Sequence, residues 1–351
     1  MIVKDEEKVI EQSLRCTLPH VNSWCIVDTG STDNTKELIQ TITAEYNIPG
    51  TLYERPWINF GHNRTEALEL ARQEKSTWLF MMDADDIFIG SFPKELAKKD
   101  GYTIHLSLSS IQYRRTLLFD SSKPWVYKFP IHEYPYLGEV TEIENLPESQ
   151  CSIQCRTIGS RSQNPNKYSD DAILLEKEFE RGEFEERAAF YAAQSWKDSG
   201  NVDSAIQWYL IRVSLGGWKE EKYVSYLNLI RLTDDIQLKL DYAWKGLAIC
   251  PERKEVPHAL LESFRKASVW HIQAYAIGLL AFRHNLQNIS NNTSLFIEPD
   301  VYAYKFYDEF SLTAFYTGHI QEAQDSVKLA LDGAPKWEED RLLENIKCIF
   351  A

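Results

Sequence analysis

The feature that most constrains the fold of this chain is a change of pattern near residue 160. Before it, short apolar runs typical of buried strands alternate with segments whose apolar residues recur at helical spacing. Such alternation predicts an α/β domain with a largely parallel sheet. After a polar joint at 160–166, the pattern is almost entirely amphipathic helix. We therefore expect an α/β domain over 1–160 and an all-α domain over 161–351.

The expected elements of the first domain follow one another closely. Helical spacing of Thr35, Leu38, Ile39 and Ile42 predicts one helix, and Ala67, Leu68 and Ala71 mark a second one. Strands are predicted over 24–27, 50–54, 77–82, 102–106 and 112–119. Ligands of open α/β sheets bind at the carboxyl ends of the strands. Because the first and third of these strands end in acidic clusters, chemistry is expected there.

The second domain shows signs of a repeat. A helix, a glycine turn and a helix that starts with alanine occur at Gly200 and again at Gly318, 318 − 200 = 118 residues later. This interval holds roughly three units near the 34-residue tetratricopeptide period. Between them, 240–251 is similar to the second helix and closing proline of a degenerate unit. We predict a tetratricopeptide-like helical array.

Composition excludes several classes of partner and location. The chain has 38 Lys and Arg against 52 Asp and Glu, a net charge of −14, whereas nucleic-acid binding needs a basic surface. No stretch approaches the ~20 apolar residues of a membrane span, and the acidic N-terminus is unlike a signal peptide. Six cysteines in a chain of this length do not make a disulfide framework. We expect a cytoplasmic protein without a membrane span or a nucleic-acid partner.

Asp83-Ala84-Asp85 is the first motif with chemical meaning. It follows the apolar run 78–82, so its two carboxylates are fixed to a rigid strand. Carboxylates in this pattern can bind a hard divalent cation that neutralises a diphosphate. The pattern is also common in solvated turns, and the preceding buried strand favours the functional interpretation.

The segment from Asp28 to Thr35 is the second motif, between a strand and a helix. Gly30 suits the turn, and Ser31, Thr32 or Asp33 is expected to cap the helix. Asp28 itself ends a strand, where its carboxylate could accept a hydrogen bond from a nucleobase.

Together these motifs carry a resemblance. Ile2 to Glu7, Ile26 to Thr35, Trp57 with Phe60 and Asn63-Arg64, and Met82 to Asp86 resemble, in order, the family 2 glycosyltransferases of the GT-A fold, a Rossmann-like nucleotide-diphospho-sugar transferase fold. A subgroup of that family carries a tetratricopeptide-type C-terminal region. Similar chains occur in bacteria and in large DNA viruses, so the expected compartment is the bacterial cytoplasm or that of a virus-infected host cell.

The resemblance implies roles for individual residues. The expected donor is a nucleotide sugar, most often a UDP-sugar, and the cofactor is Mn²⁺ or Mg²⁺. Asp85 is expected to bind the metal directly, and Asp83 to lie near ribose and metal. The predicted nucleotide-sugar contacts are Val3, Lys4, Asp5, Glu6, Asp28, Arg64, Asp83 and Ala84. Thr65 stands where the family commonly has Asn, which leaves the contacts at this helix start open.

His132-Glu133 is the third motif, placed after an aromatic segment. Inverting transfer needs a carboxylate base on the acceptor side, and Glu133 is the predicted base. His132 is predicted as a further metal ligand or a phosphate contact. The alternative is an exposed pair in a loop, and in an extended segment the two side chains point to opposite faces.

The sequence thus predicts a metal-dependent inverting glycosyltransferase that acts on a hydroxyl of a glycan or protein acceptor. A sugar nucleotidyltransferase is one alternative, although 1–11 lacks the glycine of a phosphate loop. A tetratricopeptide-type binding scaffold with weak or no catalysis is the other. The helical region could also mediate a homodimer.

Overall fold

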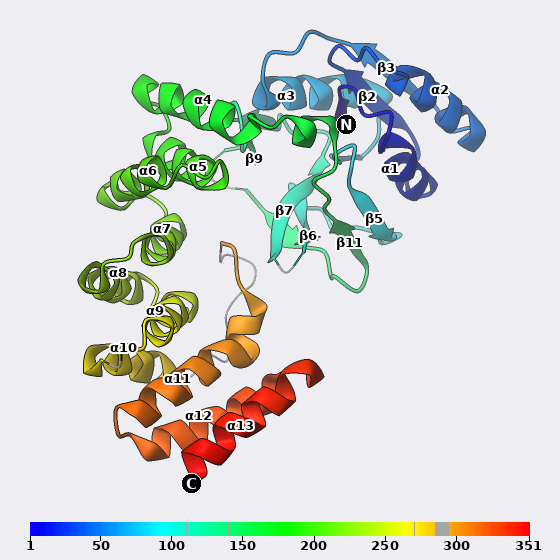
Figure 1. Ribbon diagram of the computed structural model, residues 1–351. Helices are drawn as coiled ribbons and strands as arrows, with labels where there is room; N and C mark the ends of the chain where they lie inside the picture. Colours follow the sequence, from blue (N-terminus) through cyan, green and yellow to red (C-terminus); the bar gives the residue numbers. More distant parts are fainter. Residues whose placement is uncertain (110, 139–140, 270, 285–294) are drawn as a thin grey trace. The chain divides into compact units, whose positions relative to one another are not determined.

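The computed structural model describes residues 1–109, 111–138, 141–269, 271–284 and 295–351, which form two compact units, Met1–Asp171 and Ala172–Ala351 (Figure 1). An α/β unit followed by an all-α unit is the expected fold class, which is confirmed. The units divide after Asp171, whereas the expected boundary lay after residue 160. The joint packs with the first unit because Ser160 N donates to Glu6 and Arg161 pairs with Asp171.

A three-stranded parallel sheet begins the α/β unit. Its order is β1 (Ile2–Val3), β2 (Trp24–Asp28) and β3 (Gly50–Glu54). Because neighbouring side chains on a strand face opposite ways, Ile26 packs with α1 (Ile10–Thr17) and α2 (Thr35–Tyr46), and Val27 packs with α3 (Phe60–Ala71). The helices and strands predicted for this part are confirmed.

A second, mixed sheet completes the unit, in the order β4-β7-β6-β11-β5, with β10 beside β6. Its pairs are antiparallel except β10 and β11 with β6, so the expectation of a largely parallel sheet is correct only for β1 to β3. A hairpin of β8 and β9 adds a third sheet. The strands are β4 (Trp78–Phe80), β5 (Ile87–Gly90), β6 (Gly101–Leu108), β7 (Ile111–Asp120), β8 (Val126–Lys128), β9 (Tyr134–Tyr136), β10 (Ile143–Asn145) and β11 (Cys151–Gln154).

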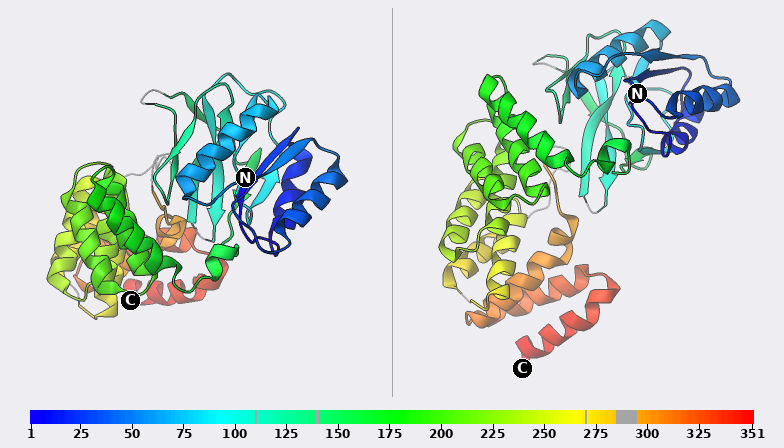
Figure 2. Two further views of the ribbon diagram at one scale, coloured as in Figure 1. Left: turned by 90° about the horizontal axis from the view of Figure 1, so that it is seen from above. Right: turned by 45° about the horizontal axis from the view of Figure 1, so that its top comes forward.

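Helical hairpins make up most of the second unit, and consecutive helices from residue 185 onward pack against each other (Figure 2). The first helices of the hairpins begin at 185, 219, 255 and 306, so the steps are 219 − 185 = 34, 255 − 219 = 36 and 306 − 255 = 51 residues. Gly200 and Gly318 take φ of +84° and +86° in the expected turns. The helices are α4 (Lys167–Arg181), α5 (Glu185–Asp198), α6 (Val202–Ser214), α7 (Lys219–Leu232), α8 (Ile236–Ile249), α9 (Glu255–Lys266), α10 (Ile272–Arg283), α11 (Phe306–Tyr316), α12 (Ile320–Gly333) and α13 (Glu339–Phe350).

A buried arginine ties these hairpins together. The Arg253 side chain is fully buried and pairs with Glu220 at 2.7 Å and with Glu255 at 2.9 Å. Its guanidinium also donates to the carbonyls of Leu295 and Phe296. None of the helices in the described ranges is both long and apolar enough to cross a lipid bilayer.

Candidate active site

Asp28 ends β2 with its side chain buried. Oδ1 accepts hydrogen bonds from the backbone amides of Gly30 and Ser31, both at 2.9 Å. Oδ2 is buried and has no hydrogen-bond partner within the described ranges. Because an unsatisfied buried acceptor costs about 1–3 kcal/mol, this oxygen is suited to a donor group from a ligand.

The loop after β1 and the loop after β2 are tied to each other. Asp5, with φ of +54°, accepts from Thr32 N at 2.7 Å, and its own amide donates to Ser31 Oγ at 2.9 Å. Of the three expected caps of α2, only Asp33 bonds to the helix start, by accepting from Thr35 N. Ser31 and Thr32 serve the neighbouring loop instead. These bonds give the first loop a defined shape.

The predicted nucleotide contacts Val3, Lys4 and Ala84 differ in what they can offer a ligand. Val3 and Ala84 have buried side chains in one apolar cluster with Ile10 and Leu14. The Val3 carbonyl already accepts from Thr29 N and Oγ1. Lys4 is exposed. Val3 and Ala84 can therefore contribute shape, and Lys4 a charge.

Arg64 lies at the centre of the site. The helix that carries it, α3, is capped by Asn59, whose side chain accepts from His62 N at 2.8 Å. The guanidinium is only 6% exposed and contacts Asp83 Oδ1 at 2.5 Å and Glu133 Oε1 at 2.6 Å. The contact with Glu133 is an ion pair without an aligned hydrogen bond, since Nε has no hydrogen-bond partner among the described residues. Arg64 therefore holds two of the predicted site carboxylates together.

Arg115, on β7, is a second arginine that the motifs did not reveal. Its guanidinium lies 3.8 Å from Asp83 Oδ2 and 3.9 Å from Glu133 Oε1. Burial alone raises the pKa of Asp83, but the two arginines outweigh this effect and hold the pKa below its ordinary value. The four side chains form a group with two charges of each sign.

Asp85 and Glu6 form a different acidic pair. Asp85 Oδ2 accepts from the amides of Ile158 and Gly159 at 3.3 and 3.1 Å, and Glu6 Oε2 accepts from Ser160 N at 3.1 Å. A methyl group added at Gly159 would lie 3.2 Å from Asp85 Oδ2 and from both Glu6 oxygens, so the two carboxylates converge on this glycine. Neither carboxylate has an ion-pair partner in the part of the chain that the structure describes.

Burial raises the pKa of three acids around this point. It raises the pKa of Glu6 to about 7, although the Ser160 amide opposes the effect. It also raises the pKa of Asp85. For Asp86, burial comes first and the charge of Asp83 second, and together they raise the pKa to about 7. A cation bound beside these acids would favour their charged forms and so lower their pKa values again.

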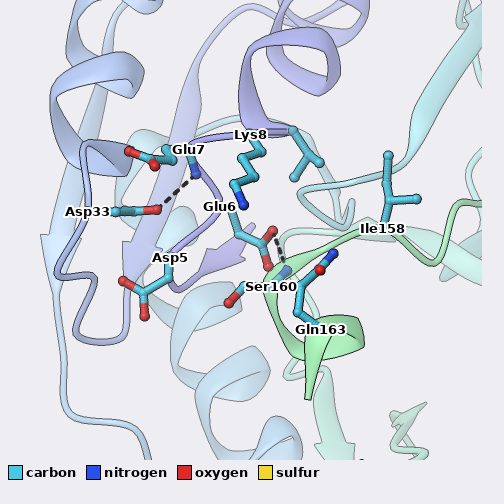
Figure 3. Close-up of a pocket in the computed structure, with 9 residues that line it drawn as sticks. Asp5, Glu6, Glu7, Lys8, Asp33, Ile158, Ser160 and Gln163 are labelled. Atoms are coloured by element: carbon cyan, nitrogen blue, oxygen red, sulfur yellow. Dashed lines mark hydrogen bonds between the residues drawn. The ribbon is translucent and has the colours of Figure 1, made fainter. Parts of the chain in front are cut away.

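A pocket of about 180 Å³ opens beside this pair, between the first loop and the segment after β11 (Figure 3). One side is lined by Asp5, Glu6, Glu7, Lys8, Val9 and Asp33, and the other by Ile158, Ser160 and Gln163. Figure 3 shows the Glu6 carboxylate turned toward Ser160 N. Four acids against one lysine make the pocket predominantly acidic on the side of the predicted nucleotide contacts.

His132 and Glu133 are adjacent in the chain but lie in different environments. His132 is exposed with φ of +55°, whereas the Glu133 side chain is 7% exposed and turned toward the arginines. Asp83, Asp85 and His132 do not bring three ligand atoms within 4.8 Å of one another in the described residues. The metal role of His132 stays a prediction.

Comparison with known proteins bears on this site directly. Residues 1–115 match the sequence model of glycosyl transferase family 2. The matched range contains Asp28, Arg64, Asp83, Asp85 and Arg115, so the resemblance expected from the motifs is confirmed. This match supports a glycosyltransferase-type function for the α/β unit. No curated protein matches the chain.

Several solved structures are distantly similar to this chain. MamA is 15% identical, with a TM-score of 0.36 over 53% of this chain and 97% of its own. A thermophilic tetratricopeptide protein of Thermus thermophilus is 15% identical, with a TM-score of 0.31 over 53% and 91%. BtubC of P. vanneervenii is 11% identical, with a TM-score of 0.37 over 54% and 83%. The all-α unit is defined by its own hairpins and not by these distant likenesses.

Proposed function

We propose that the α/β unit is a metal-dependent inverting glycosyltransferase. It moves a sugar from a nucleotide sugar, with a UDP-sugar as the first choice, to a hydroxyl of a glycan or protein acceptor. The observation that carries the proposal is the convergence of Asp85 and Glu6, without a cationic partner among the described residues, beside an Asp83 that is ion-paired to Arg64. Asp85 and Glu6 can take a dication, whereas the charge of Asp83 is already neutralised by Arg64.

The residues at this point fit a hard divalent ion. They offer carboxylate oxygens, which Mn²⁺ and Mg²⁺ prefer. The amides of Ile158 and Gly159 orient the Asp85 carboxylate, as hydrogen bonds behind a metal ligand commonly do. Asp85 would hold the ion, with Asp83 and His132 as the other predicted holders. When bound, the ion supplies charge neutralisation for the departing diphosphate.

Other residues of the chain would bind and orient the reactants. Asp28 Oδ2 would accept a hydrogen bond from the nucleobase. The loop from Val3 to Glu6 would shape the nucleoside pocket. Glu133 would take the proton of the acceptor hydroxyl. Both of its ion pairs use Oε1, so the base function would fall to Oε2.

Thermal unfolding with UDP and Mn²⁺ tests the proposal. A ligand at one hundred times its Kd stabilises by about 2.7 kcal/mol, or roughly 5–10 °C for a unit of this size. We expect this shift for the natural chain only when nucleotide and ion are both present. Asp85→Asn should abolish it. Asp325→Asn, at an exposed position on α12, is the matched control and should keep it.

The result also separates the alternatives. A binding scaffold without an active α/β unit would show no shift with any nucleotide or ion. A sugar nucleotidyltransferase would need a phosphate loop that contains glycine, and residues 1–11 contain none. A homodimer through the helical unit is a separate prediction, which sedimentation of the full chain tests.

A further inference from the structure

Arg64 and Arg115 contact the same two carboxylates in different ways. Arg64 is 6% exposed and sits at 2.5 and 2.6 Å from them, so its charge is fully engaged. Arg115 is 28% exposed and lies 3.8 and 3.9 Å away, beyond hydrogen-bonding distance. These carboxylates are its only ion-pair partners in the described residues. The guanidinium of Arg115 therefore keeps N–H donors for a ligand.

The register of β7 directs Arg115 to the acidic side of the sheet. Tyr113, two residues earlier and thus on the same face, contacts Cys155 Sγ at 3.7 Å, and that thiol lies 3.8 Å from Asp86 Oδ2. Arg114 faces the other way and donates to the Leu146 carbonyl at 2.9 Å. One face of β7 thus supplies a guanidinium beside Asp83.

The site presents both signs of charge to a ligand. Asp85 and Glu6 lack a cationic partner among the described residues, while Arg115 has donors to spare. A diphosphate with a bound dication has matching charges, and the planar fork of arginine suits phosphate oxygens. We propose that Arg115 binds the diphosphate of the nucleotide-sugar donor, whereas Arg64 is a positioning residue for Asp83 and Glu133. This inference rests on the proposed function.

Titration calorimetry with UDP and with uridine, both in Mn²⁺, tests the inference. The natural chain should bind UDP more tightly than uridine. Arg115→Gln should weaken UDP binding about tenfold or more, since hydrogen bonds to charged groups are worth about 1.5–3 kcal/mol, and should leave uridine binding unchanged. Arg114→Gln changes the neighbouring arginine on the opposite face and should keep both affinities.

Two outcomes overturn the inference: unchanged UDP binding by Arg115→Gln, or an equal loss for UDP and uridine, which would indicate a structural role. If Arg115→Gln does not fold, Arg115→Lys decides, because it keeps the charge and loses the fork. Arg115→Lys should then weaken the binding of UDP but not of uridine. Unchanged UDP affinity in this variant would contradict the inference. A natural chain that binds neither ligand overturns the proposed function instead, and this inference with it.

Discussion

The two units use buried arginine in contrasting ways. In the helical unit, Arg253 is fully buried, and its donors meet two glutamates and two carbonyls. In the α/β unit, Arg115 is partly exposed and has only loose ion pairs among the residues described. The donors of Arg253 are occupied and stabilise the fold, whereas a guanidinium with donors to spare can bind a ligand. Arg253 and Arg115 thus differ both in burial and in how many of their donors are occupied.

The largest expected effect is the loss of Arg253. Arg253→Met leaves Glu220 and Glu255 buried without their cation, which should cost about 3–5 kcal/mol of unfolding free energy. Urea denaturation measures this loss. Arg231→Met removes a half-exposed partner of Glu298 and should cost at most about 1 kcal/mol. Equal losses for the two variants would show that the burial of Arg253 and its partners does not set its contribution to stability.

Glu133→Gln tests the part of the site in which Asp83 and Glu133 are ion-paired to arginines. The amide cannot take a proton, so we expect at least about a hundredfold loss of transfer rate, the usual contribution of a general base. UDP affinity should persist because Arg64 keeps Asp83 as a partner. Turnover assays and titration calorimetry give the two values. A collapse of UDP affinity would place Glu133 in the donor pocket.

Acidification should act in opposite directions through Glu6 in the α/β unit and His258 in the helical unit. Burial raises the pKa of Glu6 to about 7, so its proton stabilises the fold below pH 4.5 and this contribution is lost as the pH rises through 7. Burial lowers the pKa of His258 to about 4, so its contribution is present above pH 6.5 and lost as the pH falls through 4.

Melting temperatures of two variants separate these contributions. Relative to Glu6→Gln, the natural chain should become less stable as the pH rises from 4.5 to 7. Relative to His258→Gln, it should become less stable as the pH falls from 6.5 to 4. Differences that do not change with pH would contradict both assignments.

The smallest expected effect concerns helix caps. Asn59→Ala removes the cap of α3 and should cost about 1 kcal/mol, with a small loss of UDP affinity because α3 carries Arg64. Asn201→Ala removes the matching cap of α6 and should cost as much stability without changing UDP binding. An effect of both variants on binding would show that stability alone controls the site.

Local patterns predicted much of this fold. The strands at 24–27 and 50–54 and the first helices are confirmed because each depends on residues close in sequence. The pairing of β11 with β6 and β5 could not be predicted from the sequence, because an apolar run does not identify the strand it pairs with. The same limit explains why the expected parallel sheet is correct for only three strands.

The same limit applies to the site: single residues could be predicted from local sequence, but contacts between distant segments could not. Asp28, Arg64, Asp83 and Asp85 follow predicted strands or begin a predicted helix, so their place could be anticipated. The convergence of Glu6 and Asp85 at Gly159 depends on segments far apart in the chain. Arg115 did not stand out, because Arg114 lies in the same predicted strand and is satisfied by a backbone carbonyl.

The position of β11 has a consequence for how this protein is made. β5 and β6 do not pair with each other but share β11 between them. Asp85 meets its Gly159 amide 74 residues further along the chain. On the ribosome, the edges of β5 and β6 therefore stay exposed until residues 151–159 emerge. Until then Asp85 also lacks the amide that orients its carboxylate. A fragment that stops at residue 115 keeps those edges bare and should aggregate by strand pairing.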